Sequence, residues 1–382
     1  MNQSKMVELG TIIKQAEIVR CLGGDYPVLS MTMHDGLVFQ DNKFKKAIAS
    51  KDKSDYKVVM RNQLVISFPI DEGVLATQRI VDAGIVSPAY GIWDIDQEKI
   101  VPEFLEYALR CNRALNYYKT KLRGSTARRR SLPTPTLLAF TVPLPNICEQ
   151  EAILEIIHKA KAVVHARKKE LDMLDNLVKA RFVECFESKS WITVPVGSIM
   201  RNMRNGISPS NRGTHRAKVL TLSAITQGAF SPNAWKDGAF DIEPPIEKRV
   251  SAADFYMCRG NGNKNLVGVG AYSKYDRQDL VFPDTIIAAT VDLQKVCLPY
   301  LFHAWKRPSI RKQIERSART TNGTYKINQR VVSSVELSLP PMELQREFAT
   351  FVEQSDKSKV AVQKALYEAQ LLLDSLMQKY FG

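Results

Sequence analysis

Two runs of basic residues are the part of this chain whose residue types and spacing could do chemistry. Residues 107–131 and 306–330 each hold eight Lys and Arg residues, with no acidic residue in the first run and only Glu315 in the second. Such runs are often solvated surface, but two at matching places favour contact with a nucleic-acid backbone. The predicted phosphate-contacting residues are Arg110, Arg113, Lys119, Lys121, Arg123, Arg128, Arg129, Arg130, Arg307, Arg311, Lys312, Arg316, Arg319 and Lys326.

Reading base edges requires Arg, Asn, Gln, Ser or Thr side chains on loops or element ends. Residues 201–213 have this composition, and we interpret them as a loop, which could equally be plain polar surface. The counterpart in the first half, residues 14–25, is weaker. The candidate base-reading residues are Arg201, Arg204, Asn205, Ser208, Ser210, Asn211 and Arg212.

Catalytic motifs do not occur in the sequence. It lacks a phosphate-binding loop, a zinc-protease motif, a nucleophile elbow and the motif of amino-methyltransferases. The glycines from Gly260 to Gly270 lack the spacing of a cofactor loop, so we interpret Gly260–Asn263 as a tight turn. His158 and His165 are seven residues apart, too far for shared metal ligation on consecutive turns. We therefore expect no catalytic residue, no metal site and no enzymatic activity in this chain alone.

The elements that must position these residues occur twice. Residues 144–150 (LPNICEQ) return as residues 339–345 (LPPMELQ), at an offset of 195 residues, and each copy opens a long helical pattern. Asn146 is a plausible cap of the first helix, since its side chain can accept from the amide of Glu149. A repeat of this length indicates a duplicated domain followed by a duplicated helix.

Apolar residues in both helical patterns step alternately by four and three, which is the coiled-coil period. We expect the two helices to pair as an antiparallel coiled coil. Four polar residues interrupt the apolar pattern: Arg167, Arg181, Ser355 and Lys359. Three interpretations stay open: they set the register of the helix pair, they face a third helix from a partner protein, or their side chains extend from the edge of the seam into solvent. The predicted seam consists of Ile153, Ile157, Val164, Leu171, Leu174, Val178, Phe348, Val352, Leu366, Leu373 and Leu376.

Strands and helices are mixed without regular βαβ alternation, so the fold class is α/β in the mixed α+β sense. Val101-Pro102 and Leu298-Pro299 each predict a helix with proline in its first turn. The predicted domains are 1–146 and 188–340, with long helices at 147–187 and 341–382, and they form an internal pseudo-two-fold repeat.

The net charge of +14 lies on the globular parts. Residues 1–146 carry 20 Lys+Arg against 15 Asp+Glu, and residues 188–340 carry 22 against 11. The two helices each have a net charge of −1. No apolar run is long enough to span a membrane, and the six cysteines form no C-x-x-C pair. We expect a cytoplasmic protein with reduced thiols and no membrane partner.

The duplicated order resembles the specificity (S) subunits of type I restriction-modification enzymes. That family has a target-recognition domain, a P-L-P-x-x-E-Q motif and a long helix, and then repeats all three. Residues 143–150 are very close to this pattern, and residues 339–345 depart from it in Leu344, which replaces the glutamate. The resemblance covers essentially the whole chain.

The resemblance implies a non-catalytic subunit that recognises a bipartite, interrupted sequence in double-stranded DNA. One half-site would be read by each globular domain, with the helices as a ruler for the gap. Methyltransferase (M) subunits would dock on the helices, and restriction (R) subunits would be further partners. S-adenosylmethionine, ATP and Mg would be used by those partners, with no cofactor bound by this chain. The alternative is a coiled-coil adaptor or scaffold that binds nucleic acid nonspecifically.

Overall fold

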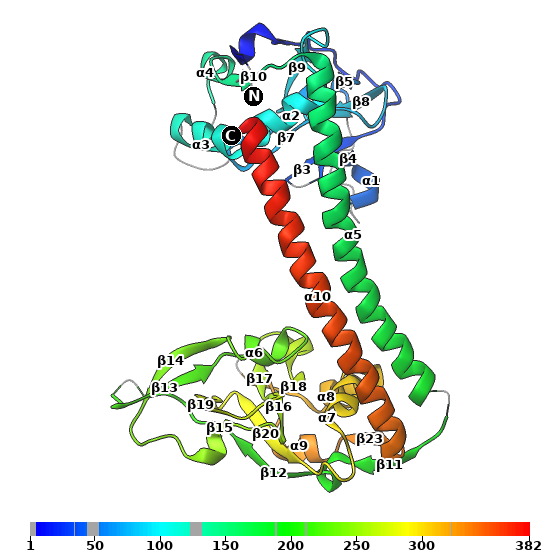
Figure 1. Cartoon of the computed structure of the whole chain (residues 1–382), viewed down its shortest axis with the longest axis vertical. Coiled ribbons are helices and arrows are strands. Elements are labelled where there is room, and N and C mark those ends of the chain that lie inside the picture. Colours follow the sequence, from blue (N-terminus) through cyan, green and yellow to red (C-terminus); the bar gives the residue numbers. More distant parts are fainter. Residues whose placement is uncertain are drawn as a thin grey trace. The chain divides into compact units, whose positions relative to one another are not determined.

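The computed structural model describes residues 5–33, 35–43, 53–122, 132–187, 189–210, 212–321 and 323–382. They form two compact units: unit 1 is Met1–Lys169 with Gln363–Gly382, and unit 2 is Glu170–Val362. Two 40-residue helices, α5 (Ile147–Phe186) and α10 (Met342–Phe381), each contribute to both units (Figure 1). The two long helical patterns of the sequence are therefore confirmed, and the fold is mixed α/β.

Helix α5 begins with a reciprocal pair of hydrogen bonds. The amide of Glu149 donates to Asn146 Oδ1 at 2.9 Å, and the amide of Asn146 donates to Glu149 Oε2 at 3.1 Å. These bonds satisfy two donors that a helix start leaves unpaired, and the carboxylate also lies at the positive end of the helix dipole. The predicted cap is confirmed. Helix α10 has Leu344 and Pro341 at the equivalent positions and lacks the pair.

Unit 1 is built on a four-stranded antiparallel sheet whose strand order is β2-β9-β6-β7. The hairpin of β3 and β4, the antiparallel pair of β5 and β8, and the pair of β1 and β10 complete its strands. The strands are β1 (Met6–Glu8), β2 (Ile13–Gln15), β3 (Leu29–Thr32), β4 (Gly36–Phe39), β5 (Lys57–Met60), β6 (Leu64–Ile66), β7 (Leu75–Thr77), β8 (Ala83–Val86), β9 (Gly91–Ile95) and β10 (Thr141–Pro143). Its short helices are α1 (Gln40–Lys43), α2 (Pro102–Arg110), α3 (Asn112–Lys121) and α4 (Thr134–Leu138).

Unit 2 has a sheet of matching antiparallel order, β12-β20-β16-β18, together with a second four-stranded sheet, β14-β13-β19-β15, and a three-stranded sheet, β17-β22-β21. Strands β11 and β23 pair as β1 and β10 do in unit 1. The strands are β11 (Ile192–Pro195), β12 (Met200–Asn205), β13 (His215–Leu220), β14 (Trp235–Phe240), β15 (Arg249–Val250), β16 (Asp254–Cys258), β17 (Gly260–Asn261), β18 (Gly270–Tyr272), β19 (Arg277–Val281), β20 (Ile286–Val291), β21 (Arg319–Thr321), β22 (Thr324–Lys326) and β23 (Glu336–Leu339). Its short helices are α6 (Ser223–Thr226), α7 (Leu298–Trp305), α8 (Pro308–Ser317) and α9 (Gln329–Ser333).

Helices α2 and α7 start with proline in the first turn, as predicted. Proline suits this position because its missing N–H would have no partner in the helix. Each of these helices buries its apolar face against the long helices of its own unit. In unit 1, Phe104 of α2 lies 4.9 Å from Phe381 of α10 between ring centroids, and in unit 2, Tyr300 of α7 lies 4.8 Å from Phe186 of α5.

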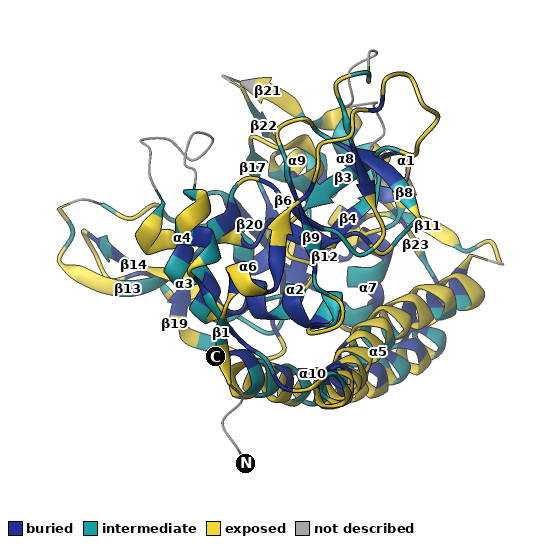
Figure 2. Ribbon diagram, turned by 90° about the horizontal axis from the view of Figure 1, so that it is seen from above, coloured by how far each residue is buried: buried dark blue, intermediate teal, exposed yellow. Residues whose placement is uncertain are grey.

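The cores of both units include the long helices (Figure 2). In unit 1, Ile157 and Val164 of α5 share a cluster with Leu373 of α10. In unit 2, Val178 of α5 shares one with Phe348 and Val352 of α10. Early α5 thus packs with late α10, and late α5 with early α10. All eleven residues of the predicted seam are buried or half-buried.

Candidate nucleic-acid interface

The first basic run falls largely on α3 of unit 1. Lys119 and Lys121 are exposed on this helix. Arg110, at the end of α2, is held by Glu106 at 3.3 Å and by the carbonyl of Met33 at 2.8 Å. Arg113 stacks on Phe140 at 4.7 Å and donates to the carbonyl of Thr141 at 2.9 Å. Of this run, the described structure leaves the two lysines most available to a partner; Arg123, Arg128, Arg129 and Arg130 lie outside the described residues.

The second run falls on α8 and on the hairpin of β21 and β22 in unit 2. Arg307 pairs with Glu187 at 2.5 Å, with its guanidinium 5.8 Å from the centroid of Phe182. Arg311 donates to the carbonyls of Val267 and Asn265 at 2.7 and 3.0 Å. Both arginines therefore hold parts of unit 2 together. Among the predicted phosphate contacts of this run, the exposed ones are Lys312, Arg316, Arg319 and Lys326.

The segment 201–213 is not a loop over its whole length, which corrects the sequence interpretation. Residues through Asn205 form strand β12, which pairs with β20 and is irregular between Arg201 and Arg204. The β20 residues that pair with β12 lie 80 or more residues later in the chain. Local composition, which is typical of a loop here, could not reveal this pairing. Arg201 is exposed and pairs with Asp292 at 2.9 Å. Ser208, Ser210 and Arg212 follow the strand, and Asn211 lies outside the described residues.

Arg204 is part of a buried polar network. Its guanidinium forms an ion pair with Asp254, whose side chain is 1% exposed. Asp254 also accepts from Thr290 Oγ1 at 2.8 Å, and Arg204 donates to the carbonyl of Glu247. Burial, and next the charge of Asp254, raise the pKa of the neighbouring Tyr256 hydroxyl. A buried carboxylate without its cation is costly, so Arg204 has a structural use in β12 that does not require DNA. Asn205 is half-buried beside it.

The repeated glutamine of the two motifs explains part of the sequence repeat. Gln150 Oε1 accepts from the amide of Val101 at 2.8 Å, and its Nε2 donates to the carbonyls of Lys99 and Pro145 at 2.9 and 2.8 Å. Gln345 bonds Cys297, Lys295 and Pro340 in the same way at 3.0, 3.2 and 2.8 Å. Both glutamines are 0% exposed. Each one ties the start of a long helix to the segment that opens α2 or α7, and periodicity alone does not indicate this role.

A second polar network joins α5 to α2 in unit 1. His158 bonds Glu103 at 2.9 Å, and Arg79 pairs with the same carboxylate at 2.7 Å. Lys161 Nζ lies 2.8 Å from the Tyr107 hydroxyl. Burial, reinforced by Glu103 and Glu106, raises the pKa of Tyr107 to about 12. His158 is thus used within the protein, and we assign this network to helix packing.

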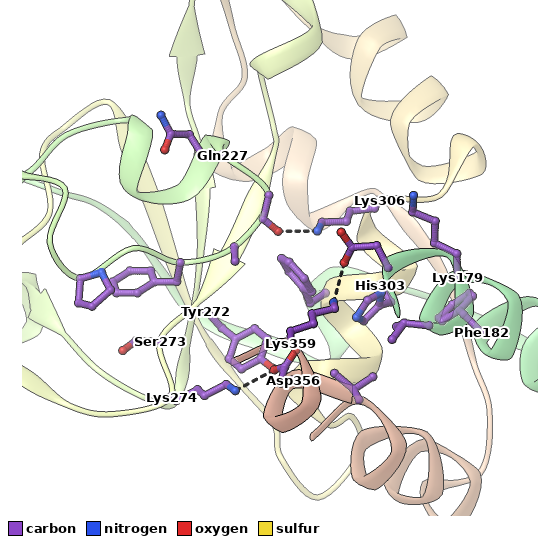
Figure 3. Close-up of a pocket in the computed structure, with 18 of the residues that line it drawn as sticks. Lys179, Phe182, Gln227, Tyr272, Ser273, Lys274, His303, Lys306, Asp356 and Lys359 are labelled. Carbon is purple, nitrogen blue, oxygen red and sulfur yellow. Dashed lines mark hydrogen bonds and ion pairs between the residues drawn. The ribbon is translucent and has the colours of Figure 1, made fainter. Parts of the chain in front are cut away.

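Unit 2 contains a cavity of about 820 Å³ between α5, α7, α10 and the segments around Gln227 and Ser273 (Figure 3). Two lysines in its wall form ion pairs: Lys274 with Asp356 at 2.9 Å, and Lys359 with Asp175 at 2.6 Å. The second pair links α10 to α5, which gives Lys359 of the predicted seam a partner. Burial, followed by the charges of Lys306 and Lys359, lowers the pKa of His303 to about 4, against partial opposition from Asp356 and Asp175.

One face of α5 carries apolar residues that remain exposed in both units. Ile156, Val163, Met173 and Leu177 are between 41% and 61% exposed. With the positions between them they form a second series that steps by four and three, which we call the outer stripe. The outer stripe consists of Ala152, Ile156, Lys159, Val163, Ala166, Glu170, Met173, Leu177 and Ala180.

No described helix is both long enough and apolar enough to cross a membrane.

The sequence is similar to those of known specificity subunits. No family model matches the chain. The chain is 26% identical over 268 residues to the type I restriction enzyme EcoKI specificity subunit of Escherichia coli (strain K12), covering 63% of this chain and 57% of that protein. It is 21% identical over 291 residues to the StySPI specificity subunit of Salmonella potsdam, covering 70% and 62%. The alignments thus span less than two thirds of each relative's length.

Solved structures show the same likeness in fold. A chain from a study of complex assembly in the type I restriction-modification system superimposes with a TM-score of 0.64 and 15% identity, over 100% of this chain and 98% of that one. The S subunit of the type I system of M. genitalium gives 0.56 and 13%, over 100% and 97%.

Proposed function

From this similarity to type I restriction-modification specificity subunits, we propose that the chain is the DNA-recognising subunit of such a complex. It would bind an interrupted, two-part sequence in double-stranded DNA and direct methyltransferase and restriction subunits to it. It would have no catalytic site of its own, and S-adenosylmethionine, ATP and Mg would be used by the partners.

The observation that carries this proposal is that both units present exposed cations from an equivalent element. In each unit a short helix follows the proline-started helix: α3 carries Lys119 and Lys121, and α8 carries Lys312 and Arg316. Cations that face solvent can displace counterions from a DNA backbone, and a duplicated protein suits a two-part site. An adaptor that joins two proteins needs no such repeated basic surface, so this alternative is not favoured.

The long helices suit a spacer. Their seam residues pack in the order of an antiparallel pair, and Lys359 of α10 reaches Asp175 of α5. A pair of helices packed against each other resists bending better than an extended linker does. We therefore assign α5 and α10 the role of holding the gap between the two half-sites.

The outer stripe of α5 supports docking of the methyltransferase subunits. Exposed apolar residues with coiled-coil spacing complement the seam of another helix. Lys159 and Glu170 interrupt the stripe once each with opposite charges, which would favour one register of the docked helix.

A map of N6-methyladenine in the host genome, with and without this gene, tests the proposal. We expect one interrupted motif to lose methylation when the gene is deleted and to regain it when the gene is restored. An unchanged map, in a strain whose methyltransferase subunit is shown to be expressed, would refute the proposed function.

A further inference from the structure

In unit 2, the loop 262–265, helix α8 and strands β21 and β22 carry five exposed cations for which the described residues supply no ion pair. They contrast with other cations of the same unit, such as Arg201, Arg204 and Arg249, which pair with Asp292, Asp254 and Glu243. Cations left without a protein carboxylate can exchange their water and counterions for phosphate oxygens. The five, which we call the cation patch, are Lys264, Lys312, Arg316, Arg319 and Lys326, and all are exposed.

The cation patch lies on elements joined to one another. Residues 259–269 connect β16 to β18, and β17 of this connection pairs with β22, with Gly260 opposite Lys326. Strand β22 pairs in turn with β21, with Lys326 opposite Arg319. Figure 2 shows β21, β22 and β17 side by side, with β21 drawn as exposed. Helix α8 ends at Ser317, two residues before β21 begins.

A polar loop, residues 262–265, projects next to these strands. All four residues are exposed, and nothing lies within 4 Å of the position that a Cβ of Gly262 would occupy. Asn263 Oδ1 accepts from the amide of Asn265 at 3.0 Å and so shapes the loop. For the Asn265 side chain, the described residues supply no hydrogen-bond partner. Its amide therefore presents one donor and one acceptor group to solvent.

The C-terminal end of this loop is held firmly. Arg311 binds the carbonyls of Asn265 and Val267, and Trp305 Nε1 donates to the carbonyl of Gly268 at 2.7 Å. Gly268 has a φ of +70°, and a Cβ there would lie 2.5 Å from Ile314 Cγ2, so only glycine fits. A contact residue on a fixed backbone binds without first losing loop entropy. Arg311, which the sequence grouped with the phosphate contacts, is in the structure a positioning residue.

We propose that residues 262–265 form a base-contacting loop of unit 2, in which the Asn265 amide binds the N6 and N7 edge of an adenine in the major groove. The cation patch flanks the loop and binds the adjoining phosphates. An asparagine amide matches adenine because it can accept from N6 and donate to N7 at once. This inference rests on the proposed function and names part of its recognition site.

The test compares the sequence preference of Asn265→Ala with that of the wild-type full-length chain, selected from a pool of random-sequence DNA duplexes. We expect discrimination at one adenine of one half-site to fall about 5- to 100-fold, with the other half-site unchanged. Asn233→Ala removes an exposed amide elsewhere in unit 2 and should leave the motif unchanged. Unchanged preference in Asn265→Ala, with the wild type selecting a two-part motif, overturns the loop assignment alone.

Two further variants separate the roles within the loop. Lys326→Ala should weaken binding to all duplexes similarly and reduce the slope of log K against log salt by about 1. Arg311→Lys should relax the same base position as Asn265→Ala without changing that slope, because the loop loses its support. If the wild type selects no motif at all, the proposed function and this inference both fail. If Lys326→Ala instead alters base preference, the assignment of the patch to phosphates is overturned.

Discussion

At the scale of single residues, Gln150 and Gln345 carry the clearest stability consequence. Gln150→Ala would leave the Val101 amide and the Lys99 and Pro145 carbonyls without the fully buried amide that they bond. Unsatisfied buried groups of this kind cost about 1–3 kcal/mol each, and partial relaxation should limit the total to about 3 kcal/mol. Urea unfolding of the purified chain measures this loss.

Gln345→Ala should destabilise unit 2 to a similar extent, because its three bonds repeat those of Gln150. Gln363→Ala is the matched control, since Gln363 is exposed on α10 and its replacement should change stability by less than about 0.5 kcal/mol. Equal effects of all three substitutions would contradict the role given to the buried amides.

His303 should make unit 2 sensitive to mild acid. Its pKa is about 4 in the folded protein against 6.5 as the ordinary value, because burial and then Lys306 and Lys359 disfavour the charged ring. Between these values the unfolded chain binds a proton that the folded chain does not. Stability is therefore lost as the pH falls from about 6.5 toward 4, by about 1 kcal/mol at pH 5.5.

His303→Leu removes this titration and should lose less stability than the wild type between pH 7.5 and 5.5, as measured by urea unfolding. Carboxylates titrate in both proteins, so the difference isolates His303. His165→Leu, on an exposed face of α5, should follow the wild type. The same pH dependence in His303→Leu and wild type would show that His303 is not the source.

At the scale of elements, α5 carries two apolar series that differ in their exposure to solvent. The seam is covered by α10 and by the rest of each unit, whereas the outer stripe is exposed. Leu177→Glu should weaken association with the methyltransferase subunit more than about 30-fold, because a charge at a central apolar contact costs about 2 kcal/mol or more. Co-purification and titration of the two subunits measure this effect.

The thermal stability of the isolated Leu177→Glu chain should match that of the wild type, since Leu177 is 51% exposed. His165→Glu adds the same charge on a face of α5 that belongs to neither series, and it should bind the partner normally. Normal binding by Leu177→Glu would assign the partner to another surface.

At the scale of the whole molecule, helix length should set the tolerated gap between half-sites. Adding seven residues to both α5 and α10, after Lys169 and Val362 where the compact units divide, preserves the heptad phase. The added rise is about 10 Å, so the gap in the methylated motif should lengthen by about one to three base pairs. Methylome sequencing measures the motif, and changed half-sites would contradict the spacer role.

Much of this architecture was predictable from sequence because it depends on local or periodic signals. The 195-residue repeat, the heptad steps, the Asn146–Glu149 cap and the prolines of α2 and α7 all act within a few residues or along one helix. The family resemblance rests on the same signals. Together they determine a duplicated mixed α/β protein with two long helices.

Only the tertiary structure decided which polar side chains are available to a ligand. Arg204 lies 50 residues from Asp254, and Arg311 lies 44 residues from the Val267 carbonyl that it binds, so neither pairing follows from sequence spacing. The same long-range packing leaves Lys326 on β22 and Asn265 in the loop after β17 exposed. Composition and periodicity identify basic and apolar residues, but strand pairing across the chain determines which charges are neutralised inside the protein.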